Sequence, residues 1–309
     1  MQSDSRRSRM RRQPTGKRLL LTSRDTEIFK ALARYRYLRS TYLHAFAGGA
    51  SETRFKERLG DLFHEGYLDR PEAQWRLAGS RHVPVIYELG KGGRDAFTRA
   101  GTFGDERRVL LGPNAHRQFE HSVMVCEVLA SIELAAMTKA DLRFVPLPEI
   151  LAKAPESARR GLVPFRMHGG ANGEHCVIPD AIFGLEYRAE ARASYRFFAL
   201  EADRGTMPIE RTRHTATSYG AKLRAYKSII SENVHRSQLG VPNLIVLTVT
   251  TSSARKDAML RALAHAPGDF SPFLFAAAPA LTGPDFNLIH HRWDRRDGSG
   301  FIIDRPGAK

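Results

Sequence analysis

Apolar residues in the first hundred positions recur at intervals of three and four, the spacing of amphipathic helices. Three helices are predicted from this pattern. The first follows a capping residue at Thr22 or Ser23, the second follows Ser40 or Thr41, and the third starts at Ser51. A pair of glycines ends the second helix in a tight turn. The spacing therefore predicts a compact three-helix arrangement at this end of the chain.

The third predicted helix has one apolar and one basic face. Its outward positions include three cations: Arg54, Lys56 and Arg58. A glycine stop and a short strand follow it, and a second strand is predicted over residues 83–89. The polar stretch between the two strands carries Arg81. Two strands around a basic loop form a wing beside the helices.

The rest of the chain alternates between helical and strand-like patterns. Residues 101–113 contain three glycines and a proline, and we interpret them as a linker. A long helix is predicted from Asn114 to about Met137. Later elements are expected in this order: strands near 142–145, 176–183 and 195–203, a helix at about 210–233, a strand at 243–249, a helix near 253–264 and a strand at 273–275. The α-β-β-β-α-β order is typical of a domain that layers helices on a sheet.

The net charge of the chain indicates what kind of partner it binds. The chain has 48 Lys and Arg against 33 Asp and Glu, a net charge of +15. Its first eighteen residues hold seven cations and one acid among Ser, Gln, Pro and Gly, which predicts a disordered basic arm over residues 1–19. The remaining chain still keeps a net charge of +9. Such a balance favours a densely negative partner, and nucleic acid fits best.

Several classes of protein are disfavoured by the sequence. No apolar run approaches the length of a membrane span and no signal-peptide core follows the basic start, so we expect a soluble cytoplasmic protein without membrane contact. The two cysteines, Cys126 and Cys176, stand outside any zinc-binding spacing and are expected to be reduced thiols. A homodimer is possible, although no heptad segment supports it.

Three acids in the predicted strands suggest a catalytic site. Asp180 follows Pro179 at a strand bend, and Glu201 and Asp203 share one face of a later strand. If Asp180 lies on the adjacent strand, the three carboxylates converge as ligands for Mg²⁺ or Mn²⁺. Such a metal would activate water against a phosphodiester. Lys222, on the following helix, would then stabilise charge in the transition state.

The elements over residues 20–100 resemble bacterial winged helix-turn-helix domains. The resemblance rests on three helices, a strand, a basic loop and the segment Tyr87-Glu88-Leu89-Gly90-Lys91-Gly92-Gly93. It implies a third helix that enters the major groove of DNA and a wing that contacts the backbone or minor groove. The implied DNA-binding residues are the three outward cations of the third helix together with Arg81 in the wing.

Residues 114–309 resemble the PD-(D/E)xK nuclease superfamily, which implies a restriction-endonuclease-like domain. The matching segments are Ile178-Pro179-Asp180 and Leu200-Glu201-Ala202-Asp203, with Lys222 further on. The sequence departs from the superfamily at Asp203, where a lysine is usual, so Lys222 is the nearest replacement. The whole chain also looks like the replication-relaxation family of plasmids and other mobile elements, through Leu21-Thr22-Ser23-Arg24-Asp25 and the segment 200–206. That resemblance implies a role in replication, mobilisation or control of a mobile element.

Three functions remain open at this stage. The first is a metal-dependent DNA endonuclease or nickase that uses Asp180, Glu201 and Lys222. The second is a non-enzymatic DNA-binding transcriptional regulator or replication accessory protein with an inactive nuclease-like domain, in which the acids pair with one of three nearby arginines: Arg204, Arg211 or Arg213. The third is a relaxase with a tyrosine nucleophile, such as Tyr35, Tyr37 or Tyr226, which predicts a covalent protein-DNA adduct. His121 is either a site residue or a hydrogen-bonded core residue.

Overall fold

The structure is a computed structural model of the 309-residue chain. It describes residues 7–49, 51–77, 79, 81–99, 119–160, 165–170, 175–190, 192–209, 218–264, 266–278, 283–284 and 287–306. Within these residues, ten α-helices accompany a mixed seven-stranded sheet and two smaller sheets. The chain divides into two compact units: unit 1 is Met1–Arg108 with Thr282–Asp285, and unit 2 is Val109–Leu281 with Phe286–Lys309. The predicted linker 101–113 lies outside the described residues.

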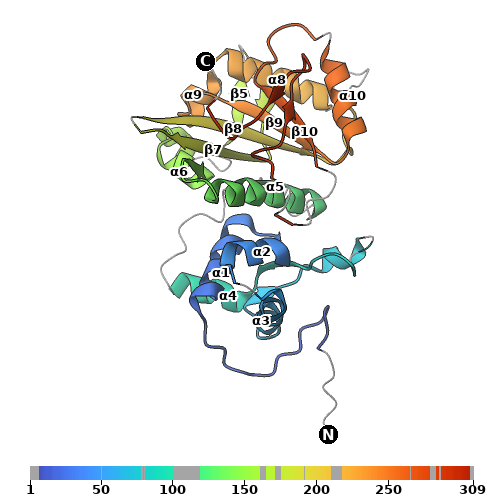
Figure 1. The fold of residues 1–309 in the computed structure, drawn as a ribbon. Coiled ribbons are helices and arrows are strands. Elements are labelled where there is room, and N and C mark those ends of the chain that lie inside the picture. The colour runs from blue at the N-terminus through green and yellow to red at the C-terminus, as the bar shows by residue number, and fades with distance from the viewer. Residues whose placement is uncertain are drawn as a thin grey trace. The chain divides into compact units, whose positions relative to one another are not determined.

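Unit 1 combines four helices with a small antiparallel sheet (Figure 1). The helices are α1 (Ser23–Tyr35), α2 (Ser40–Ala47), α3 (Glu52–His64) and α4 (Lys91–Arg99). The strands are β1 (Leu38–Arg39), β2 (Leu68–Asp69) and β3 (Ile86–Leu89), in the order β1-β3-β2. The segment between β2 and β3 includes a short 3₁₀ helix, Glu72–Arg76.

Local sequence explains where these helices begin and how they pack. Thr22 caps α1 in a capping box with Asp25, and the Ser51 side chain caps α3. The glycines after β3 allow close backbone contact, since a Cβ on Gly93 would lie 2.2 Å from the carbonyl oxygen of Tyr67. The strand expected over residues 83–89 is shorter than predicted and begins only at Ile86.

The structure describes part of the predicted basic arm, from Arg7 onward. Residues 7–18 form neither helix nor strand, but they lie against unit 1. The Arg12 guanidinium donates to the carbonyl oxygens of Phe63 (2.9 Å) and Leu68 (3.0 Å), and the Gln13 amide donates to His64. The acceptors are two backbone carbonyls, one near the end of α3 and one in β2, and the side-chain Nδ1 of His64, which accepts from the Gln13 backbone N–H.

Unit 2 is built on the seven-stranded sheet in the order β12-β11-β10-β9-β8-β7-β4. The strands are β4 (Leu142–Val145), β7 (Ala181–Arg188), β8 (Ala193–Asp203), β9 (Ile245–Thr250), β10 (Phe273–Ala277), β11 (Trp293–Asp294) and β12 (Gly300–Phe301). Neighbours β8, β9 and β10 run parallel, and the other neighbouring pairs are antiparallel. A separate two-stranded sheet pairs β5 (Met167–Gly169) with β6 (His175–Val177).

Helices cover both faces of this sheet (Figure 1). They are α5 (Phe119–Met137), α6 (Leu147–Ala152), α7 (Glu156–Arg160), α8 (Tyr219–Ser231), α9 (Val234–Leu239) and α10 (Ser253–Ala264). Helix α5 packs on one face against β4 and β8. On the opposite face, α8 places Leu223, Tyr226 and Ile229 in a core with Ala199 of β8 and Val246 of β9.

Some predicted elements of unit 2 differ from the structure. The strand expected at 176–183 is interrupted, because β6 ends at Val177 and β7 begins at Ala181, on either side of Pro179. Proline has no backbone N–H for a sheet ladder, which accounts for the break. The stretch between the strands predicted near 142–145 and 176–183, where no element was expected, contains α6, α7 and β5. Residues 210–217 of one predicted helix lie outside the described residues, and α8 begins at Tyr219.

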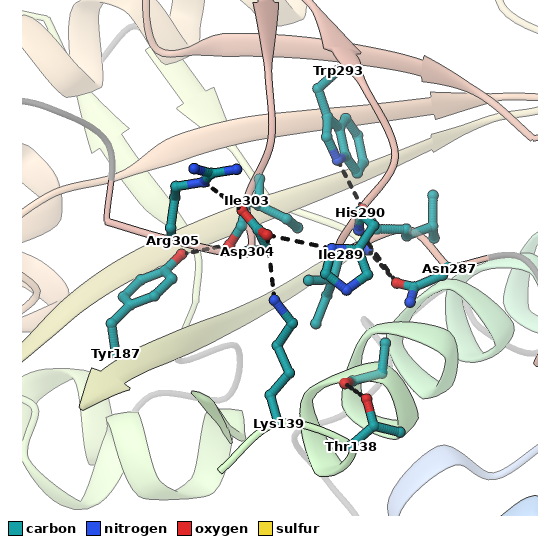
Figure 2. Close-up of polar contacts among 12 residues, drawn as sticks. Thr138, Lys139, Tyr187, Asn287, Ile289, His290, Trp293, Ile303, Asp304 and Arg305 are labelled. Carbon is teal, nitrogen blue, oxygen red and sulfur yellow. Dashed lines mark hydrogen bonds and ion pairs between the residues drawn. The ribbon is translucent and has the colours of Figure 1, made fainter. Parts of the chain in front are cut away.

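The C-terminal segment is fastened to the sheet and to α5 by polar contacts (Figure 2). The Asp304 carboxylate lies 3.3 Å from both Lys139 Nζ, just beyond α5, and His290 Nδ1. The Tyr187 hydroxyl of β7 donates to the carbonyl oxygen of Ile303 (2.8 Å). The contacts of Lys139 and Tyr187 join residues more than a hundred positions apart in the sequence.

Candidate functional site

The register of β7 and β8 places Asp180 beside Glu201. Ala181 pairs with Leu200 across the two antiparallel strands, so Asp180 lies opposite Glu201 at the next position. The Asp180 backbone N–H donates to the Leu200 carbonyl (3.0 Å), and the Ala202 N–H donates to Asp180 Oδ2 (2.8 Å). Opposite residues of an antiparallel pair lie on the same face of a sheet. The structure therefore brings these two predicted site residues together.

Glu201 is buried and held by two residues of α8. Its Oε2 forms an ion pair with Lys222 Nζ, and its Oε1 accepts a hydrogen bond from the Tyr226 hydroxyl. Lys222 and Tyr226 are four positions apart, so they lie on the same side of the helix. Burial, with a smaller contribution from the charge of Asp180, raises the pKa of Glu201 to about 7. Burial opposes the charge on Lys222, but the two nearby carboxylates prevail and raise its pKa.

His121, from the first turn of α5, completes this cluster. Its Nε2 lies 3.1 Å from Asp180 Oδ1. Burial would lower the pKa of His121, but the hydrogen bond and negative charge of Asp180 raise it. Burial likewise opposes ionisation of Asp180, yet the charge of Lys222 and the contact with His121 lower its pKa. Sequence reasoning left two roles open for His121, and the geometry places it in the site.

Asp203 has different partners from Glu201, although it lies two residues further along β8. Arg255 of α10 binds it with two nitrogens, Nε at 2.9 Å and Nη2 at 3.1 Å. The Thr250 hydroxyl (3.2 Å) and the Gly205 N–H (3.0 Å) also donate to its Oδ2. The expectation that Asp203 joins Asp180 and Glu201 around one metal is not supported by these contacts, because a bidentate guanidinium already occupies its oxygens.

The arginines expected near the acids have other positions. Arg204 forms an ion pair with Glu120 of α5, and Arg211 and Arg213 lie outside the described residues. In the part of the chain that the structure describes, no group of three His, Cys, Asp or Glu side chains is placed to hold a metal ion. The half-buried carboxylate of Asp180 and the buried carboxylate of Glu201 remain as oxygen donors. That number still fits Mg²⁺, which is commonly bound through one or two carboxylates together with water and substrate phosphates.

The predicted DNA-binding cations of unit 1 fall into two groups. Arg54, Lys56 and Arg81 are exposed. Lys56 pairs with Glu52 one turn earlier on α3, at 2.7 Å. Arg58 instead turns inward, where it contacts both oxygens of the buried Asp25 at 3.0 and 2.6 Å. This contact fixes α3 to the start of α1, so Arg58 has a structural partner that sequence spacing did not reveal.

Comparison with known proteins assigns a family to this architecture. The sequence profile described as Replication-relaxation matches residues 29–243, more than two thirds of the chain. The chain belongs to the replication-relaxation family. The matched range includes Asp180, Glu201 and Lys222 but ends before Arg255. No curated protein and no solved structure is significantly similar to the chain.

Two further observations bear on this replication-relaxation protein. Among the described residues, no helix is both long and apolar enough to cross a membrane. The tyrosines considered as nucleophiles are buried: Tyr35 is 2 % exposed, Tyr37 6 % and Tyr226 0 %. A buried hydroxyl cannot reach a phosphate of DNA without rearrangement of the core. The burial of these three tyrosines therefore does not favour a covalent tyrosine mechanism.

Proposed function

We propose that this member of the replication-relaxation family is a metal-dependent DNA endonuclease or nickase that acts in replication or mobilisation of a plasmid or other mobile element. The observation that carries the proposal is the pair formed by the half-buried Asp180 and the buried Glu201, held beside Lys222. Strongly shifted pKa values in a cluster of acids and cations are frequent at catalytic sites.

The topology of unit 2 supports the nuclease interpretation. Strands β4, β7, β8 and β9 are adjacent in the sheet, antiparallel up to β8 and parallel from β8 to β9, with α8 as the crossover. Helix α5 precedes them and packs on the sheet. This order agrees with the α-β-β-β-α-β arrangement of restriction-endonuclease-like domains, the fold expected from the two acidic segments.

Each site residue has a distinct role in this proposal. Asp180 and Glu201 would hold Mg²⁺ or Mn²⁺ through their oxygen atoms. When bound, the metal supplies positive charge that polarises the scissile phosphate and activates water. Lys222 approaches Glu201 from α8, so its ammonium replaces the lysine that the motif lacks at Asp203 and stabilises the phosphate oxygens. His121 adds a second donor at the Asp180 side of the site.

Unit 1 would bind the DNA as a winged helix-turn-helix domain. Its order of elements, α1-β1-α2-α3-β2-β3, agrees with that fold. Arg54 and Lys56 are exposed on α3, the helix that would enter the major groove, and Arg81 lies in the wing between β2 and β3. Arg58 supports this surface indirectly by holding α3 in place.

Nicking of supercoiled plasmid tests the proposal. The unmodified protein is compared with Asp180→Asn, Glu201→Gln and Lys222→Met, and with the control Asp257→Asn, an exposed acid of α10 whose side chain is 52 % exposed. We expect nicking that requires Mg²⁺ or Mn²⁺, is lost in the three site variants and persists in the control. Plasmid binding by the unmodified protein without cleavage under either metal would refute the nuclease proposal.

A second function is favoured by one observation. Both oxygens of Asp180 and both oxygens of Glu201 already have partners within the protein, and Asp203 occupies the usual lysine position. These features suit a non-enzymatic DNA-binding regulator or replication accessory protein that retains a nuclease-like fold. Equal DNA binding by the unmodified protein and Glu201→Gln, without metal-dependent cleavage by either, would support this alternative.

A further inference from the structure

Unit 2 has a second concave feature, at the other end of β8 from Glu201. A cavity of about 230 Å³ opens there between β4, α6, the start of β8 and the segment after α9. Its walls are mostly apolar and include Ile150, Phe197 and Val241. Tyr195, at the cavity, and Glu201 are six positions apart, which corresponds to about 20 Å along a strand. The cavity is therefore separate from the candidate catalytic site.

Tyr195 presents an aromatic ring at this cavity. It is the only exposed tyrosine among the nine in the chain, all of which are described, with 37 % of its surface exposed. Its ring stacks on Phe197 with the centroids 6.4 Å apart and the planes 11° apart. The Asn243 side chain accepts from the Phe197 N–H and donates to the Tyr195 carbonyl, both at 2.9 Å. An exposed ring is thus held in a fixed position, which reduces the entropy lost when a ligand stacks on it.

Cations exceed acids around this ring. Lys153 lines the cavity with 75 % of its side chain exposed, and Arg236 donates to the carbonyl of the lining residue Pro242. The two acids nearby are Glu149 and Glu186. Glu149 forms ion pairs with Arg143 (2.7 Å) and with Lys153 (3.8 Å). Glu186 forms ion pairs with Arg143 and with Arg188 (3.6 Å), and it accepts a hydrogen bond from Tyr195. Four cations, Arg143, Lys153, Arg188 and Arg236, thus stand against these two acids. The charge around the cavity therefore favours an anionic ligand.

We infer that this cavity binds an unpaired base of single-stranded DNA. The base stacks against Tyr195 and Phe197, and the flanking phosphates contact Lys153 and Arg236. Aromatic side chains beside a cationic surface are the combination that binds single strands without sequence preference. A duplex is excluded because its bases are stacked within the helix. The inference rests on the proposed function in taking DNA as the ligand, but it does not require nicking.

Fluorescence anisotropy of the full chain in EDTA tests the inference, with a labelled 15-nucleotide oligothymidylate and a duplex of the same length as probes. Stacking on one aromatic ring changes affinity about five- to tenfold or more. We therefore expect Tyr195→Ser to weaken single-strand binding by about that factor and to leave duplex binding unchanged. Tyr195→Phe retains the ring and is expected to stay within about twofold of the unmodified protein.

Charge variants and cross-linking give independent measurements. Lys153→Glu is expected to weaken single-strand binding and reduce its salt dependence, since one phosphate contact is lost. The control Arg292→Glu, with 65 % of the side chain exposed on the C-terminal segment, should bind normally. An oligothymidylate with one 5-iodouracil is expected to form a photochemical cross-link to the peptide that contains Tyr195.

Two outcomes would overturn the inference. One is single-strand binding by Tyr195→Ser as tight as that of the unmodified protein, which would leave the cavity to an apolar side chain of a protein partner. The other is an equal loss of single-strand and duplex binding in that variant. Neither outcome affects plasmid nicking by the Asp180 and Glu201 site, and a failure of nicking leaves a Tyr195-dependent affinity unaffected, so the two proposals fail separately.

Discussion

Glu201 and Asp203 lie two residues apart on β8, yet the protein surrounds them differently. Glu201 contacts a lysine and a tyrosine of α8, and Asp180 beside it contacts a histidine. Asp203 contacts an arginine of α10 through two parallel hydrogen bonds. An ammonium is a point charge on a flexible stem, whereas a guanidinium holds a carboxylate in a fixed planar geometry. A shared strand face therefore does not give two acids the same function.

The two acids differ in how readily their oxygen atoms can change partners. Carboxylates paired with lysine or histidine can exchange those partners for a metal or a proton. Asp203 forms a bidentate pair with arginine and also accepts hydrogen bonds from Thr250 and Gly205. Both of its oxygens are therefore held by partners within the protein. In the proposed nuclease-like motif, Asp203 stands where lysine is usual, and its contact with Arg255 joins β8 to α10.

The strongest test compares nicking by Glu201→Gln and Asp203→Asn. Loss of a preorganised charged group at a catalytic centre lowers rates by about 10²–10³. We expect at least that loss for Glu201→Gln, and for Asp203→Asn a rate within about tenfold of the unmodified protein at a temperature where both are folded. Initial rates of plasmid relaxation measure the difference. Equal losses in two folded variants would remove the distinction between the acids.

Urea unfolding tests the structural role of the Asp203 pair. Arg255→Met leaves a buried carboxylate without its cation, which we expect to cost about 3–5 kcal/mol of stability. Lys222→Met should cost less at pH 6, because Glu201, with a pKa already raised to about 7, can take up a proton when its cation is removed. A larger loss for Lys222→Met than for Arg255→Met at pH 6 would contradict this interpretation.

The same pKa predicts how stability without metal depends on pH. In the folded protein the pKa of Glu201 is about 7, against 4.5 for the free side chain, so the folded state binds this proton more tightly. Its contribution is fully present below about pH 4.5 and is lost as pH rises through about 7. We expect the free energy of unfolding of the unmodified protein, relative to Glu201→Gln, to fall between pH 5 and pH 8. A difference that stays constant or rises over this interval would show that Glu201 is already ionised at low pH.

Local patterns predicted much of the fold. Strand β8 ends at Asp203 and α10 spans residues 253–264, as the period-two and helical patterns indicate. The mixed helix and sheet composition is confirmed. Short strands such as β11 and β12, two residues each, were missed because they carry no periodic signal of their own. Pro179 marked the bend before Asp180, but the pattern did not show that it separates two different sheets.

Ion pairs between residues far apart in the sequence could not be predicted. Arg255 stands 52 positions after Asp203, and nothing in the local spacing connects them. Arg204, the nearest arginine to Asp203, pairs instead with Glu120. The same limit applies in unit 1, where helical spacing placed Arg58 on the outward face of α3 with Arg54. Only the three-dimensional structure shows that Arg58 reaches Asp25, 33 positions earlier.

Unit 1 contains a similar contrast between a charged side chain paired inside the protein, Arg58, and an exposed one, Arg54. Asp25 is buried, and burial opposes its ionisation, but the hydrogen bonds from Arg58 and Thr22 lower its pKa. Removing the guanidinium in Arg58→Ala leaves a buried carboxylate partly unsatisfied, and we expect a loss of about 1–3 kcal/mol. Arg54→Ala, at an exposed position, should change stability by no more than about 0.5 kcal/mol.

For DNA binding we expect the reverse order, with Arg54 more important than Arg58. At a temperature where both variants are folded, Arg54→Ala is expected to weaken duplex binding and to reduce its salt dependence, because an exposed cation that contacts phosphate releases a counterion. Arg58→Ala should retain that salt dependence, since its guanidinium is bound to Asp25 rather than to DNA. Thermal unfolding and anisotropy titrations at two salt concentrations measure both effects. An Arg58→Ala variant with unchanged stability and a reduced salt slope would place Arg58 among the DNA contacts and reverse the assignment.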